Sequence, residues 1–229
     1  MKKDKTIGEI VAADYRAASV FKEAGIDFCC GGKKSIEETC AEKGIDKSEL
    51  ISKLERLEST PNTTTHNFIE WELGFLCDYV VNTHHKYVLK SLPVLVAYTE
   101  KIASVHGDRH PELREVTRLF SHINEELLQH LKNEEKILFP AIKEVLKSGS
   151  PEAKETIKSE ISRLSGEHEF AGGVMDKINV ITSGYLVPDD GCNTYQIAFR
   201  LLNEFEDDLH THVHLENNIL YPKAIASTN

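Results

Sequence analysis

A pattern of chemically active residue types occurs twice in this chain. A histidine is followed four residues later by a glutamate, and each pair leads into Ile-Leu-aromatic-Pro. The first copy contains His130 and Glu134, and the second contains His212 and Glu216. A spacing of four residues places an imidazole and a carboxylate one above the other on a single helix face. Two such helices facing each other could hold two metal ions.

The apolar residues around both copies predict that this face is buried, because they recur at helical spacing with each His/Glu pair. For one copy alone, a hydrogen-bonded pair within a core would be the better interpretation. Two copies favour a metal, because burying two carboxylates and two imidazoles uncompensated costs on the order of several kcal/mol. The apolar residues are Leu119, Ile123, Leu127, Ile137 and Ala141 for the first copy, and Ala198, Leu201, Phe205, Leu209, Ile219 and Leu220 for the second.

Further histidines can be sorted by the helix face on which they fall. His168 lies on the apolar stripe of another predicted helix, and we interpret it as a ligand. His84 and His85 are adjacent and both have apolar neighbours at helical spacing, with a slight preference for His85. His106 lies in a predicted loop, where periodicity cannot place it and a surface position is favoured. Polar neighbours predict solvent exposure for three others: His122, His210 and His214.

The elements that must position these residues are all predicted to be helices. Three short helices come first, and a segment without apolar residues, 59–66, reads as a linker. Four long helices with short connections then predict an antiparallel four-helix bundle in an all-α protein. The short helices are expected over residues 6–24 with a cap at Thr6, from the Ser35/Glu38 capping box to Gly44, and from Asp46 to about Glu58. The long ones are expected over 67–104, 112–147, 152–185 and 194–225, which gives domains 1–58 and 67–229.

Composition narrows the functional classes. The 229 residues carry a net charge of −10, which argues against nucleic acid as a partner and against an anionic membrane surface. No apolar run approaches the roughly 20 residues that span a bilayer. The start of the chain leads into an amphipathic helix rather than a signal peptide. Five cysteines, an odd number, do not suggest a disulfide framework, so reduced thiols and a cytoplasmic location are expected.

Two adjacent cysteines, Cys29 and Cys30, form a second candidate site. They precede two glycines and a predicted helix start, and Lys33 and Lys34 follow closely. Thiols in such a setting should ionise more readily, which suits redox exchange or transfer of iron. A buried pair with no chemical role is an equally supported interpretation. The remaining cysteines, Cys40, Cys77 and Cys192, belong to no motif.

Taken together, these residues resemble the di-iron proteins that repair iron–sulfur centres, the Ric or ScdA type. Those proteins join a small cysteine-containing domain to a hemerythrin-like bundle, and the resemblance covers nearly the whole chain. The motifs that carry it are Asp27-Phe28-Cys29-Cys30-Gly31-Gly32-Lys33, Leu92-Pro93 after His85, Val105-His106-Gly107-Asp108, Glu134-Glu135-Lys136-Ile137-Leu138-Phe139-Pro140, Glu167-His168 and Leu215-Glu216-Asn217-Asn218.

The resemblance implies a cofactor of two Fe ions with an oxo or hydroxo bridge, and it suggests a homodimer. It selects His85 over His84 and replaces the surface interpretation of His106 with a ligand role. The implied ligands are His85, His106, His130, His168 and His212, with Glu134 and Glu216 bridging the metals.

Such a donor set suits iron better than magnesium or calcium, which prefer oxygen ligands. Five imidazoles, two bridging carboxylates and the bridge would leave one position open on two irons that take about six ligands each. Glu126, one turn before His130, and Glu167, next to His168, could orient a ligand or relay protons. Solvated glutamates are an equally supported interpretation of both.

The implied function is repair of iron–sulfur clusters damaged by nitrosative or oxidative stress, through donation of iron from a labile site. Damaged iron–sulfur proteins would be the partners, and nitric oxide, dioxygen or peroxide the small ligands. Two alternatives use the same centre: an enzyme that reduces nitric oxide or peroxide, and a sensor or carrier of dioxygen or nitric oxide. Whether the protein is an enzyme therefore stays open at this point.

Overall fold

The structure, a computed structural model, describes residues 5–59 and 67–229. Helices dominate these residues, and the only β-type pairing among them is an isolated bridge between Thr6 and Ser35. The prediction of an all-α protein is confirmed. Of the expected linker 59–66, only Ser59 lies within the described residues, as the last residue of a helix.

The chain divides into two compact units. The first comprises residues 1–76 with 210–227 and 229, and the second comprises residues 77–209 with 228. The short N-terminal helices belong to the first unit, together with the last residues of the final long helix. Most of the four-helix bundle forms the second unit.

The N-terminal helices of the first unit begin and end where their sequence signals lie. Thr6 and Ser35 both form capping boxes, with Glu9 and Glu38 respectively, and the helix that follows Ser35 ends at Gly44 in the left-handed conformation. These two expectations are confirmed. The helices are α1 (Ile7–Ala13), α2 (Ala17–Glu23), α3 (Ile36–Lys43) and α4 (Lys47–Ser59), with a 3-10 turn, η1 (Gly31–Lys33).

The single helix predicted over residues 6–24 is wrong, because α1 and α2 are separate. Asp14 ends α1 in an extended conformation, with φ −149°. Its carboxylate accepts hydrogen bonds from the backbone N–H of Arg16 at 3.1 Å and from the Arg16 guanidinium. A short acidic side chain that bonds nearby backbone in this way competes with helix continuation. Both halves carry apolar residues at helical spacing, so the periodicity did not reveal the break.

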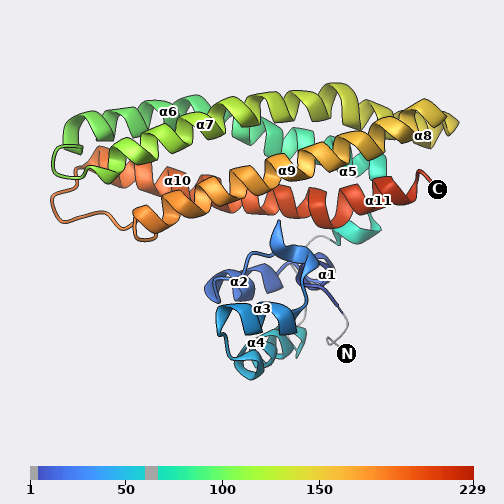
Figure 1. Cartoon of the computed structure of the whole chain (residues 1–229), viewed down its shortest axis with the longest axis horizontal. Coiled ribbons are helices and arrows are strands. Elements are labelled where there is room, and N and C mark those ends of the chain that lie inside the picture. The colour runs from blue at the N-terminus through green and yellow to red at the C-terminus, as the bar shows by residue number, and fades with distance from the viewer. Residues whose placement is uncertain (1–4, 60–66) are drawn as a thin grey trace. The chain divides into compact units, whose positions relative to one another are not determined.

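The bundle consists of four long antiparallel helical segments (Figure 1). α6 packs on α7, and α9 packs on both α7 and α8. Phe205 of α10 contacts Phe120 of α7 and Tyr87 of α6. The predicted four-helix bundle is confirmed. Its segments are α5 (Leu73–Val80), η3 (Val81–His85) and α6 (Lys86–His106); α7 (Glu112–Asn133), η4 (Glu134–Leu138) and α8 (Phe139–Ser148); α9 (Pro151–Ile181); and α10 (Asn193–Leu215), η5 (Glu216–Leu220) and α11 (Tyr221–Ala226).

Two predicted boundaries are corrected. The first long helix starts at Leu73 instead of residue 67, after a 3-10 turn, η2 (Phe68–Glu70). The third ends at Ile181 instead of 185, because Ser183 and Tyr185 have left-handed φ values of 54° and 61° that an α-helix cannot contain.

Three of the long segments contain a π turn, and two of these turns start at the repeated motif. In η4 the N–H of Phe139 donates to Glu134 O, and in η5 the N–H of Tyr221 donates to Glu216 O. Pro140 follows the first of these turns. A proline lacks an N–H and its ring clashes with the carbonyl four residues earlier, which favours a wider turn. The same reasoning applies to Pro222.

The residues buried around the two motifs differ in part from the predicted core. Leu138, four residues after Glu134, is fully buried. Ile137, which the α-helical spacing placed in the core, is 41% exposed. Around the second motif, Leu202 is buried where Leu201 was expected, and Leu201 is half-buried.

Among the described residues, no helix combines the length and the apolar character needed to cross a membrane.

Candidate metal centre

Four predicted ligand residues meet in the core of the second unit. Glu134 Oε2 lies 3.2 Å from His85 Nε2 and 3.3 Å from His130 Nε2. His168 Nε2 lies 3.0 Å from His130 Nε2. These side chains come from three segments of the bundle, and each is at most 2% exposed. Imidazole nitrogens this close to one another and to a buried carboxylate form a donor set that a cation would satisfy.

The second copy of the motif has the same internal geometry. His212 in the last turn of α10 and Glu216 at the start of η5 place Nε2 and Oε1 3.1 Å apart. Both side chains are buried. The spacing of four residues therefore produces the shared helix face that the sequence predicts.

The candidate ligand atoms form two overlapping groups, within each of which all atoms lie within 4.8 Å of one another. One group contains His85 and His212, and the other contains His130 and His168. Both groups contain Glu134 and Glu216. Two carboxylates common to two histidine pairs are the arrangement that a pair of carboxylate-bridged metals requires.

Two glutamates contact the ring nitrogens of His85 and His130 that point away from the cluster. Glu167 Oε2 lies 2.8 Å from His130 Nδ1, and Glu135 Oε1 lies 2.9 Å from His85 Nδ1. Such partners fix the ring orientation and the tautomer so that Nε2 points into the site. The hydrogen bond with His130 lowers the pKa of Glu167. The structure thus brings Glu167 to the site, whereas Glu126 is exposed on α7.

Sequence reasoning missed Glu135. The available signal was its position directly after Glu134, inside the π turn η4. The extra residue in such a turn changes the direction of the neighbouring side chains around the helix.

The structure does not bring His106 to this cluster. It is the last residue of α6, a helix of 21 residues that starts directly after His85. At 1.5 Å per residue the two histidines are separated by about 31 Å along the helix axis, so they cannot share a site. His106 is also not on the surface, since it is 4% exposed and its Nε2 lies 3.2 Å from Cys192 Sγ.

Of the histidines expected at the surface, His122 is exposed and His210 is half-buried, but His214 is fully buried. The prediction for His214 is wrong because its neighbours in the first unit come from the N-terminal helices and their connections. Its ring packs against Tyr15 and Phe28, and burial lowers its pKa to about 4. His84, set aside in favour of His85, is buried with its Nδ1 3.0 Å from Asp208.

Cys29 and Cys30 form a thiol pair organised by Asp27. The Asp27 carboxylate accepts hydrogen bonds from the backbone N–H groups of Cys29, Cys30 and Gly31 at 2.7–3.0 Å. The two sulfurs lie 4.0 Å apart and are not joined in a disulfide. The hydrogen bond with Cys30, together with burial, raises the pKa of Cys29 well above its ordinary value. The expectation of easier ionisation is therefore wrong for Cys29.

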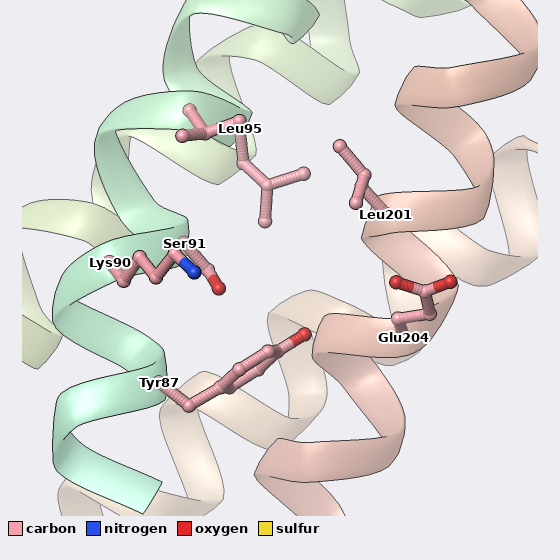
Figure 2. A pocket seen from close by; sticks show the side chains of 7 residues that line it. Tyr87, Lys90, Ser91, Leu95, Leu201 and Glu204 are labelled. Carbon is pink, nitrogen blue, oxygen red and sulfur yellow. The ribbon is translucent and has the colours of Figure 1, made fainter.

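A half-open pocket also lies between α6 and α10. Figure 2 shows Tyr87, Ser91 and Leu95 on α6 facing Leu201 and Glu204 on α10. Its walls are mainly apolar and contain none of the residues singled out above for metal binding.

A helical bundle whose core carries buried His/Glu pairs defines the class of hemerythrin-like cation-binding proteins. The family model described as "Hemerythrin HHE cation binding domain" matches residues 78–224, and the ScdA_N model, described as "Domain of Unknown function (DUF542)", matches residues 3–58.

Full-length relatives extend this match. The chain is 32% identical to the iron–sulfur cluster repair protein YtfE of Pectobacterium carotovorum, over 97% of both chains. It is 30% identical to the iron–sulfur cluster repair protein ScdA of Staphylococcus epidermidis, over 96% of this chain and 98% of that one. The chain belongs to the hemerythrin-like family of iron–sulfur cluster repair proteins.

Proposed function

We propose that this protein repairs iron–sulfur clusters damaged by nitrosative or oxidative stress by donating iron from the buried His/Glu cluster. The single observation that carries the proposal is that two groups of candidate ligands have both glutamates in common. The names of the full-length relatives support the same activity.

The ligand set that we propose has six residues. His85 and His212 would hold one iron, His130 and His168 the other, and Glu134 and Glu216 would bridge them. An oxo or hydroxo bridge would complete the pair. His106 is left out of this set, because its place at the end of α6 separates it from His85. Imidazoles with two carboxylates are donors that iron accepts well.

The smaller set leaves the centre more open than seven ligands would. If each iron takes about six ligands, four imidazoles, four carboxylate oxygens and the bridge leave one position free on each. When bound, the iron pair supplies redox chemistry and exchangeable positions for small ligands such as nitric oxide, dioxygen or peroxide. The protein contributes orientation through Glu135 and Glu167 and excludes water by burial. Because only two ligands are anionic, the site should release ferrous iron readily.

We propose three parts for the chain: a thiol domain over residues 1–58, a linker over 59–66 and the di-iron bundle over 67–229. The ligand atoms of Asp27, Cys29 and Cys30 lie within 4.8 Å of one another. This arrangement suits a transient binding site for iron during transfer. Because the pKa of Cys29 is raised, its thiol must lose a proton when metal binds. Iron capture at this pair should therefore weaken as the pH falls.

Damaged iron–sulfur proteins would receive the iron, and we place the protein in the cytoplasm as a homodimer. Neither nucleic acid nor a membrane surface is expected as a partner, given the net charge of −10.

The test is reactivation of an iron–sulfur dehydratase that has been inactivated with nitric oxide. The iron-loaded protein should restore activity beyond that given by an equal amount of free ferrous iron, while losing its own iron. Glu134→Gln should restore no more than free iron does. Formation of nitrous oxide by the diferrous protein with its iron retained would instead identify a nitric oxide reductase, and would contradict the donor proposal.

A further inference from the structure

Two residues outside the metal cluster meet at one end of the bundle. His106 ends α6, and Cys192 ends the connection that leads into α10. Figure 1 shows that the α6–α7 and α9–α10 connections lie at the same end of the bundle. The thiol of Cys192 is exposed, and its Sγ lies 3.2 Å from the buried Nε2 of His106.

Cys192 also occupies the cap position of a long helix. Its carbonyl accepts the first helical hydrogen bond, from Gln196 N–H at 3.1 Å, and α10 has 23 residues. Its sulfur faces the backbone N–H groups of Thr194 and Tyr195. These donors and the positive end of the helix dipole stabilise a thiolate at this position.

The neighbours hold both partners in place. The His106 ring packs against Tyr195 with ring centroids 5.4 Å apart, and Arg109 Nη2 lies 3.5 Å from its Nδ1. Asp190, two residues before Cys192, forms an ion pair with Arg109 at 2.8 Å, and its Oδ1 lies 2.9 Å from His110 Nε2. The connection is therefore tied to the end of the bundle on both sides of the thiol.

The charged and titratable groups around the thiol come from four segments. His106 ends α6, and Arg109 and His110 belong to the connection that follows it. Glu112 starts α7 and lies 3.3 Å from His110. Asp190 is the acidic group on the thiol's own connection. The hydrogen bond from His106 and those from the helix N–H groups lower the pKa of Cys192 to about 7.

We propose that Cys192, activated by His106, is an oxidation site that reacts with hydroperoxides to form a sulfenic acid. The Cys192 thiolate attacks the terminal peroxide oxygen, so that an S–O bond forms while the O–O bond breaks. Sulfur loses two electrons, the peroxide is reduced, and the departing hydroxide or alkoxide takes a proton from solvent. No further reactant is required.

This site is separate from the metal cluster. About 31 Å of α6 lies between His106 and His85, so reaction at Cys192 should not depend on iron. An absence of reaction at Cys192 can therefore be distinguished from a failure of the iron-donor proposal.

The first experiment measures the pH dependence of alkylation at Cys192. The iron-loaded protein is treated with iodoacetamide without oxygen, and the modified Cys192 peptide is quantified by mass spectrometry. Wild type should show a midpoint near pH 7. His106→Gln should shift it upward, toward the value of about 8.5 for an ordinary thiol but short of it, because the N–H groups of Thr194 and Tyr195 remain. His110→Gln, which changes a neighbouring histidine that contacts Asp190, should leave the midpoint in place.

A wild-type midpoint at or above that of an unfolded cysteine peptide would overturn the proposal, and this result does not depend on how the variants fold. A midpoint that His106→Gln leaves unchanged would overturn the role of His106.

The second experiment treats the protein with hydrogen peroxide in the presence of a sulfenic-acid trap. Peptide-level detection should place the adduct on Cys192 at a rate that is equal for iron-loaded and iron-free protein. An adduct found on Cys30 but not on Cys192, or one that requires iron, would contradict the assignment.

Discussion

At the scale of the residue, contacts at the outer Nδ1 atoms determine how precisely His85 and His130 are oriented toward the cluster. Glu167 holds His130 at 2.8 Å, and Glu135 does the same for His85. A ligand that must be ordered on metal binding loses rotamer entropy, whereas one already held does not. The exposed glutamates on the same helices provide natural controls.

We therefore expect Glu167→Ala to weaken iron binding by about 10–100-fold, the usual effect of removing such a partner. Glu126→Ala removes an exposed glutamate from α7 and should leave the affinity unchanged. Competition with a coloured ferrous chelator measures both. Equal affinities for the two variants would show that Glu167 does not position His130.

The residues of the cluster were predictable to different degrees. His130, Glu134, His212 and Glu216 follow from spacing alone, because a His/Glu pair that occurs twice on apolar helix faces favours a bound cation. Glu135 could not be predicted, since its contact with His85 joins residues 50 positions apart. His106 was assigned by resemblance, and helix length separates it from His85.

At the scale of the element, α1 and η5 approach closely within the first unit. A Cβ at Gly8 would overlap the Asn218 side chain, and one at Gly32 would lie 2.7 Å from Asn218 Oδ1. Asn218 has little freedom to move aside, because its Nδ2 donates to Cys29 O at 3.1 Å and also contacts His214 Nδ1.

Gly8→Ala should therefore lower the free energy of unfolding by about 1–3 kcal/mol, the typical cost of overpacking. Gly173→Ala is the matched control: it lies within α9 with open space around its Cβ, and should stabilise by about 0.5–1 kcal/mol. Denaturant unfolding followed by circular dichroism measures both changes. An unchanged free energy of unfolding in Gly8→Ala would contradict this, because it would mean that Asn218 moves aside without an energetic penalty.

The helices themselves were largely predictable, because capping boxes, glycine stops and apolar periodicity are local signals. The π turns were not. The sequence assigned both Ile137 and Ile219 to the core, and only Ile219 is buried, although each lies within a π turn. The break at Asp14 also depends on a local hydrogen bond that apolar periodicity does not report.

At the scale of the whole molecule, metal binding should contribute directly to stability, because the folded chain concentrates donors that the unfolded chain does not. Free metal at 100 times its dissociation constant stabilises a single-site protein by about 2.7 kcal/mol. For a chain of this length that corresponds to a rise in melting temperature of roughly 5–10 °C. Calorimetry of the iron-loaded protein before and after chelation should show this difference. Identical melting curves would indicate that the donors do not bind metal in the folded protein.

The most direct test of the six-residue di-iron centre is the iron content and visible spectrum of the wild type, Glu134→Gln and His106→Gln. We predict about two irons per chain with oxo-bridge absorption in the wild type, from a site that gives each metal two imidazoles and two carboxylate oxygens. Glu134→Gln should lose both irons and the absorption, whereas His106→Gln should keep both. One zinc per chain in the wild type, or loss of iron in His106→Gln, would contradict this centre.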